Sequence, residues 1–229
     1  MILKKKILIF IIFVISLALM FIYVNSSKTS YFPIKKISYG KKLENSNEED
    51  LTKIIKNYLD DKSFFNFKIS YLILELEKSE WVRNVNIRRV YPNEVRIIVE
   101  EHEPVAIWNR KKYVNSFGEL FYIEKITKNL PLLLSEEERI DIVFNYFSQF
   151  NKNLKENGID QTISKIEENE IRSLTIFLNS GFYIKLGSKD LESKINLFFK
   201  VYKSLKTRDL KKIRYIDMRY SNGFSLGFE

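Results

Sequence analysis

The residues best suited to acid–base chemistry surround the single histidine of the chain. His102 lies between Glu101 and Glu103, directly before Pro104. An imidazole beside carboxylates is a combination that general acid–base catalysis uses. Catalysis also needs a nucleophile and an orienting group that converge on one point, and no spacing in the sequence supplies them. We therefore expect a solvated linker histidine, and we interpret the carboxylates from Glu100 onward as a charged strand end rather than a catalytic pair.

The composition excludes further kinds of site. The 229 residues include no cysteine, which rules out disulfides, thiol nucleophiles and zinc–thiolate centres. One histidine leaves almost no room for a histidine metal cluster. The formal net charge is +9, but basic and acidic side chains are interleaved along the chain instead of forming the stripe typical of nucleic-acid binding. We expect no enzyme, no cofactor, no metal and no nucleic-acid partner.

Residues 215–229 have the pattern best suited to binding another protein chain. Phe224, Leu226 and Phe228 alternate with smaller side chains, as in a strand with one apolar face. Asn222-Gly223 before them is a strong hairpin signal, because both residues tolerate positive φ. A sheet that ends on such a strand presents unpaired N–H and C=O groups to another chain. The pattern alone leaves open whether this strand is interior or a docking edge.

An apolar segment near the N-terminus predicts that the chain is anchored in a membrane. Ile7–Val24 is 18 residues without a charge and follows three lysines, Lys4–Lys6. At about 1.5 Å per residue it spans roughly 27 Å, enough for a bilayer core. The positive-inside rule then predicts a cytoplasmic tail at 1–6, a transmembrane helix at 7–24 and a linker at 25–32. A cleaved signal peptide is the alternative, although its apolar region is usually shorter, about 7–15 residues.

Residues 33–102 have the pattern of a small β-α-α-β-β module in which two helices cover one face of a short sheet. Its predicted elements are a strand at 34–39, a helix behind a capping box of Ser46 and Glu49, a helix at 68–78, and strands at 81–90 and 95–100 joined by the turn 91–94.

Residues 103–229 predict a second, mixed α/β domain, so the fold class is α+β. Its predicted elements are strands at 106–109, 112–114, 174–178 and 182–186, a helix behind a second capping box of Ser135 and Glu138, a long helix after Ser188, and a closing hairpin at 213–228.

In this order the segments resemble the FtsQ/DivIB family of bacterial cell-division proteins, and the resemblance covers nearly the whole chain. The first module resembles the POTRA domain of that family, and the second resembles its C-terminal β domain. The runs that carry the resemblance are WVRNVNIRRVYPNEV at 81–95, EPVAIWN at 103–109, YVNSFGELF at 113–121, LPLL at 130–133, YIDMRY at 215–220 and Asn222-Gly223.

The resemblance implies a non-enzymatic scaffold of the divisome, located in the cell inner membrane at the septum with the bulk of the chain periplasmic. It implies an FtsB/DivIC-type partner that adds a strand beside the last strand, an FtsL-type protein that accompanies it, and other divisome proteins bound by the POTRA module. Carried over by position, the partner-binding residues would be Tyr215, Arg219, Tyr220, Asn222, Gly223, Phe224, Ser225, Phe228 and Lys189.

Some positions depart from the family pattern. Phe228 stands where some relatives carry Trp, and Ser188 stands where some carry a basic residue, a role that the adjacent Lys189 would have to take. The small residues Ser225 and Gly227 would let a partner pack closely over their face of the strand. Two other functions remain as alternatives. A POTRA-type chaperone or assembly factor in envelope protein export would be expected to carry several POTRA repeats, and an envelope hydrolase would need a catalytic motif that is not legible here.

Overall fold

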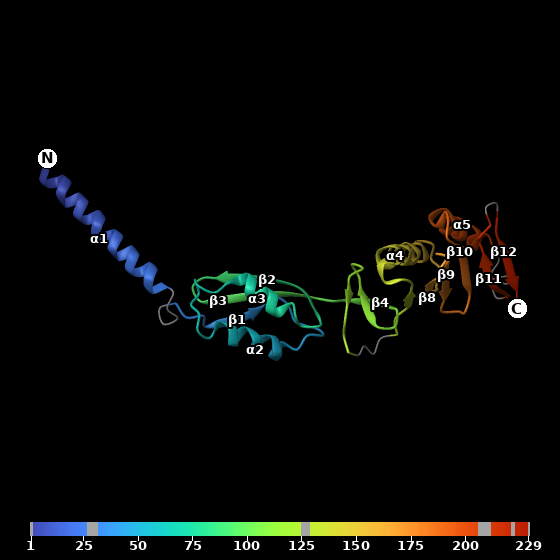
Figure 1. Ribbon diagram of the computed structural model, residues 1–229, viewed down its shortest axis with the longest axis horizontal. Coiled ribbons are helices and arrows are strands. Elements are labelled where there is room, and N and C mark those ends of the chain that lie inside the picture. The colour runs from blue at the N-terminus through green and yellow to red at the C-terminus, as the bar shows by residue number, and fades with distance from the viewer. Residues whose placement is uncertain (1, 27–31, 125–128, 206–211, 221–222, 229) are drawn as a thin grey trace. The chain divides into compact units, whose positions relative to one another are not determined.

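The computed structural model describes residues 2–26, 32–124, 129–205, 212–220 and 223–228. The chain divides into two compact units, Met1–His102 and Glu103–Glu229. Each unit combines helices with a β-sheet (Figure 1), which confirms the α+β fold class.

The first helix, α1, runs over Ile2–Ser26. Within it, Lys6–Val24 is long and apolar enough to cross a membrane, and none of this stretch is buried against the rest of the chain. A helix that is apolar all round needs an apolar environment, which the chain itself does not supply here. The chain therefore has the character of a single-pass membrane protein, with the predicted span 7–24 inside α1.

The rest of the first unit has the predicted order β-α-α-β-β. Its elements are β1 (Lys36–Tyr39), α2 (Glu48–Leu59), α3 (Ile69–Leu76), β2 (Val82–Val90) and β3 (Glu94–Glu101). The sheet order is β1-β3-β2, with β1 parallel to β3 and β2 antiparallel to it. The two edges of this sheet are therefore β1 and β2. The tight turn between β2 and β3 contains a cis Tyr91–Pro92 peptide bond.

The two helices of this module bury one face of its sheet. Leu51 and Ile55 of α2 and Leu72 of α3 are almost fully buried in a cluster with Val95 and Ile97 of β3. The i, i+3, i+4 spacing on α2 produces this stripe. Burial of each such side chain contributes about 1.5–3 kcal/mol, so packing against the helices fixes the position of the sheet.

Both predicted capping boxes are wrong in detail. The N-cap of α2 is Asn47, whose side chain accepts a hydrogen bond from the Glu49 backbone N–H at 2.9 Å, and not Ser46. Asn and Ser cap about equally well, so one residue of register decided between them. Ser135 does not cap α4 because its hydroxyl donates to the buried carboxylate of Glu168. The Ser135 hydroxyl therefore bonds to a residue distant in the sequence instead of to the start of the helix.

The second unit is built on one nine-stranded sheet of order β12-β11-β10-β9-β8-β7-β4-β5-β6. Its strands are β4 (Pro104–Trp108), β5 (Lys112–Asn115), β6 (Leu120–Phe121), β7 (Leu132–Leu134), β8 (Ile163–Glu168), β9 (Leu174–Leu178), β10 (Tyr183–Gly187), β11 (Ile213–Asp217) and β12 (Ser225–Phe228). Its helices are the 3-10 turn η1 (Glu137–Arg139), α4 (Ile140–Glu156) and α5 (Leu191–Ser204). The sequence did not predict β6, β7 or β8.

Helices α4 and α5 pack on this sheet and on each other. Phe150 of α4 lies 5.4 Å from Phe198 and 4.9 Å from Phe199 of α5, measured between ring centroids. Helix α4 contacts β8, and α5 contacts β10. The aromatic cluster joins both helices to the buried face of the sheet, as expected for the apolar stripe of α5.

Candidate functional site

Strand β12 forms one edge of the nine-stranded sheet. It pairs antiparallel with β11, with Ser225 opposite Asp217 and Phe228 opposite Ile213. Among the described residues no strand lies on its other side. This confirms the predicted edge hairpin. An edge strand presents backbone N–H and C=O groups that can pair with another chain.

The structure brings most of the predicted binding residues to one end of this edge. Strands β10 and β11 are parallel, with Lys185 opposite Asp217, so the segments that follow them emerge at the same end of the sheet. Strand β12 is antiparallel to β11 and begins at that end. The residues gathered there are Lys189, Arg219, Tyr220, Gly223, Phe224 and Ser225.

Three predicted residues are placed differently. Phe228 lies at the far end of β12, opposite Ile213. Tyr215 lies within β11, opposite Gly227. Asn222 lies outside the described residues. The predicted set therefore follows the whole length of the β12 edge instead of forming one compact cluster.

Three of these side chains are large and exposed. Tyr220 is 59% exposed, Phe224 40% and Phe228 60%. Aromatic side chains that are exposed beside an unpaired strand are typical anchors of a protein interface. Lys189 and Ser188 are also exposed, so the Lys189 ammonium is accessible to an acidic ligand.

Arg219 is held by its own chain. Its guanidinium donates to both carboxylate oxygens of Asp217, with Nε–Oδ1 at 2.9 Å and Nη2–Oδ2 at 2.7 Å. These hydrogen bonds hold the pKa of the buried Asp217 carboxyl below its usual range and raise the pKa of Arg219. A buried carboxylate is stable only when it is paired. Arg219 therefore has a structural role at the end of β11, and its side chain is also about half exposed to a partner.

An aromatic row crosses the sheet face beside this edge, and sequence reasoning missed it. Phe177 of β9 stacks on Tyr183 of β10 at 5.4 Å, and Tyr183 stacks on Tyr215 of β11 at 5.1 Å. The ammonium of Lys185 lies 4.7 Å from the centre of the Tyr215 ring. No local signal could reveal this row, because it depends on the register between separate strands.

The row ends on Gly227. A Cβ atom at Gly227 would lie 2.1 Å from the Tyr215 ring, so only glycine lets that ring rest on β12. The expected space for a partner over Gly227 is therefore filled by Tyr215 of the same chain, and that expectation was wrong. A partner strand would meet the outer side of β12, with Tyr215 packed behind it.

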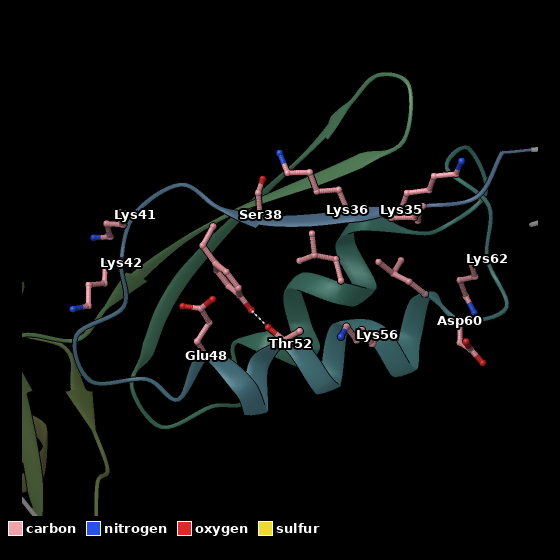
Figure 2. A pocket seen from close by; sticks show the side chains of 14 residues that line it. Lys35, Lys36, Ser38, Lys41, Lys42, Glu48, Thr52, Lys56, Asp60 and Lys62 are labelled. Carbon is pink, nitrogen blue, oxygen red and sulfur yellow. Dashed lines mark hydrogen bonds between the residues drawn. The ribbon is translucent and has the colours of Figure 1, made fainter.

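The first unit also has an exposed sheet edge, strand β1, and charged side chains surround it. Strand β1 and helix α2 enclose a groove of about 870 Å³ (Figure 2). Figure 2 shows lysines along the length of this groove and Thr52 on its helical wall. The hydroxyls of Tyr39 and Thr52 are 3.0 Å apart and join the strand to the helix. The lysines that line the groove are Lys35, Lys36, Lys41, Lys42, Lys56 and Lys62.

Among the described residues, four of these six lysines have no acidic partner. Lys36 pairs with Glu94 at 3.0 Å, and Lys62 pairs with Asp61. Within the described ranges the other lysines of the groove form no salt bridge. The groove therefore carries positive charge that is available to an acidic ligand.

The backbone of β1 is open toward this groove. Lys36 N–H donates to Asn93 O at 3.3 Å, and Gly40 N–H donates to Ile97 O at 2.8 Å, so both point toward β3. Successive residues of a strand alternate in direction, so the N–H groups of Ile37 and Tyr39 point to the free edge. A second chain could pair with β1 there.

The residues around His102 have structural roles. The His102 backbone N–H donates to Trp81 O at 2.8 Å. The Glu101 carboxylate accepts backbone hydrogen bonds from Glu44, Asn45 and Ser46. Burial acts to raise the pKa of Glu101, but these hydrogen bonds outweigh it and lower the pKa. In the part of the chain that the structure describes, no three His, Cys, Asp or Glu residues could hold a metal ion together.

Comparison with known proteins gives consistent matches for both units. The family model described as "POTRA domain, FtsQ-type" matches residues 32–102, and "Cell division protein FtsQ/DivIB, C-terminal" matches residues 106–219. The chain is 28% identical to "Cell division protein FtsQ" of Coxiella burnetii over 196 residues, covering 85% of this chain and 79% of that protein. It is 27% identical over 199 residues to the protein of the same name from Actinobacillus pleuropneumoniae, covering 86% of each chain. The Haemophilus influenzae protein of that name is 30% identical over 169 residues, which are 72% of this chain and 66% of the relative.

Proposed function

Because the chain belongs to the FtsQ/DivIB family of bacterial cell-division proteins, we propose that it is a non-enzymatic scaffold of the divisome that binds an FtsB/DivIC-type partner at strand β12. The observation that carries this proposal is the position of β12 at a free edge of the nine-stranded sheet. The partner adds an antiparallel or parallel strand there, and an FtsL-type protein accompanies it.

Main-chain hydrogen bonds supply part of the affinity in this mode, and side chains beside the edge supply specificity. Tyr220 and Phe224 at one end of β12 and Phe228 at the other are exposed and suited to be anchors. The Asp217–Arg219 pair holds the end of β11 in place, so less conformational freedom is lost on binding.

Lys189 supplies the basic contact in this proposal. Ser188 carries no charge and cannot form an ion pair with an acidic group, whereas the adjacent Lys189 is exposed at the same end of the sheet as Tyr220. A lysine is a flexible point charge, so it can reach a carboxylate from a neighbouring position.

The proposal places residues 33–102 and 103–229 outside the cytoplasm of the cell, with α1 as an uncleaved anchor. The lysines before the apolar stretch favour a cytoplasmic N-terminus by the positive-inside rule. The chain then lies in the inner membrane at the division septum. The first unit binds other divisome proteins, and the open edge of β1 with its lysine-lined groove is the surface that fits an acidic extended segment.

The test compares two exposed tyrosines of the second unit. Tyr220→Ala removes an anchor beside β12, and we expect capture of a purified FtsB/DivIC-type partner by the full chain to fall about tenfold or more. Tyr122→Ala is the matched control, because Tyr122 is 62% exposed and follows β6 at the opposite edge of the sheet. Equal capture by both variants and the unchanged chain would exclude β12 as the docking edge.

The location in the cell is tested separately, with the unchanged chain. A fluorescent fusion of the unchanged chain is expected to concentrate at mid-cell in dividing cells. Uniform envelope fluorescence, with normal division after depletion of the protein, would contradict the role in division.

A further inference from the structure

One end of the first unit carries an aromatic cluster in which two exposed rings surround a buried ring, Phe64. Tyr91 is 79% exposed and Phe65 is 51% exposed. The Phe65 ring lies 5.0 Å from Phe32 and 5.2 Å from Phe64, and Phe64 lies 6.5 Å from Tyr91. We call Phe32, Phe64, Phe65 and Tyr91 the aromatic cluster. Exposed apolar groups that gather in one place mark an interaction surface.

The cluster is rigid because hydrogen bonds join the three segments that form it. Phe64 N–H donates to Phe32 O at 2.8 Å. Arg89 of β2 donates through Nε to Phe64 O at 2.8 Å. Lys35 N–H donates to Asn93 O, in the turn after Tyr91, at 2.9 Å. The backbone segments that carry the exposed rings are therefore joined to one another before any ligand binds.

The cluster lies where the chain arrives from the membrane anchor. Helix α1 ends at Ser26, and Phe32 is the sixth residue after it. Six residues span at most roughly 22 Å when fully extended, so the cluster cannot move far from the end of α1. Tyr side chains are enriched at the membrane–water interface, and Phe side chains occur on the lipid-facing side of interfacial segments. The exposed Lys35, whose backbone N–H joins it to the turn after Tyr91, adjoins the cluster and suits anionic headgroups.

We propose that the aromatic cluster is a membrane-contact surface, in which Phe65 and Tyr91 enter the headgroup region of the leaflet from which the chain emerges. The inference rests on α1 as an uncleaved anchor but not on any protein partner. Contact at this end would fix the height of the first unit above the bilayer, and with it the position of the β1 groove. The ligand is the phospholipid surface itself.

The absence of cysteine makes a direct test possible. Phe65→Cys and Tyr91→Cys place a single environment-sensitive NBD label in the cluster. Glu80→Cys is the matched control, because Glu80 is exposed before the start of β2 and Tyr91 follows its end. The nine residues of β2 separate the two positions by roughly 30 Å at about 3.3 Å per residue.

The full chain is reconstituted in nanodiscs of phosphatidylcholine and phosphatidylglycerol, with and without lipids that carry a spin label near the headgroup. We expect at least twofold quenching at 65 and 91, blue-shifted emission at both, and little change at 80. Co-elution with nanodiscs and equal quenching at all three positions would overturn the contact surface alone. Failure to co-elute would overturn the anchor and the contact surface together.

A second measurement guards against a damaged fold. The thermal unfolding temperature of each labelled chain is compared with that of the unlabelled chain. Of the two cluster variants, Tyr91→Cys is expected to change this temperature less, because Tyr91 is the most exposed ring of the cluster. If Tyr91→Cys folds normally and its label stays unquenched, the proposal is wrong whatever Phe65→Cys does.

Discussion

The two units each offer a free strand edge, and the two edges are made of different chemistry. The β12 edge of the second unit has exposed aromatic rings beside it. Its nearby charged residues, Asp217 and Arg219, are paired with each other. Beside β1 of the first unit stands a groove lined by lysines, most of them without an acidic partner among the described residues. The backbone is available at both edges, so the side chains decide what each edge can bind.

This difference predicts different binding behaviour. Buried aromatic anchors act mainly on dissociation, and unpaired rim charges act mainly on association and its dependence on salt. The β12 edge should therefore form a long-lived complex that salt disturbs little. The β1 edge should form rapid contacts that salt weakens.

The largest expected effect comes from Gly227. Gly227→Val drives a branched side chain into the Tyr215 ring, because even a Cβ atom would lie 2.1 Å from it. We expect a loss of about 1–3 kcal/mol in the free energy of unfolding of the second unit and loss of partner capture, since β12 must move. Thermal unfolding and capture assays measure both.

Gly223→Ala is the control for that substitution. A Cβ atom at Gly223 meets no atom within 4 Å, and the residue precedes the same strand. We expect stability close to that of the unchanged chain. Normal capture by Gly227→Val would show that the packing of Tyr215 on β12 does not shape the docking edge.

A smaller effect is expected from charge reversal at the other edge. Changing Lys41, Lys42 and Lys56 to Glu reverses the charge of the groove without removing a salt bridge among the described residues. We expect about tenfold weaker binding of a peptide that alternates Glu with Val, chiefly through slower association at low salt. Surface plasmon resonance at two salt concentrations measures it.

The same triple variant should leave the β12 edge unaffected. Capture of the FtsB/DivIC-type partner is expected to match that of the unchanged chain within twofold. Equal loss at both edges would mean that the two surfaces do not act separately, and the comparison between them would fail.

The smallest effect concerns acid sensitivity of β1. Hydrogen bonds from Ser38 and then Lys36 hold the pKa of Glu94 at about 2, below its ordinary value of 4.5. A lowered carboxyl pKa stabilises the folded state above the unfolded pKa, and that stabilisation is lost as pH falls through the window from about 5 to 2. Glu94→Gln should remove this pH dependence.

Hydrogen exchange of the β1 backbone amides between pH 5 and pH 3 measures the effect. The unchanged chain should lose protection across this window relative to its value at pH 6, after correction for the intrinsic exchange rate. Glu94→Gln should be less protected at pH 6 and should change less. The same acid response in both chains would show that Glu94 does not hold β1 to β3.

Most helices and strands could be predicted from local patterns. The stripe of α2, the stripe of α5 and the hairpin at 213–228 each depend on side chains within a few residues of one another. The three-residue β7 and the charged β8 were missed because they are strands only through their neighbours in the sheet. The candidate binding residues came from position in a family, and the structure distributed them along one edge.

The sequence by itself determined the apolar anchor, the two-unit α+β organisation and the alternation of the final strand, because these depend on short-range periodicity. Only the tertiary structure decided that Tyr215 rests on Gly227, that Arg219 is held by Asp217, and that Phe65 and Tyr91 both pack against Phe64. Such contacts depend on strand register and chain crossings between distant segments. Local spacing does not contain that information.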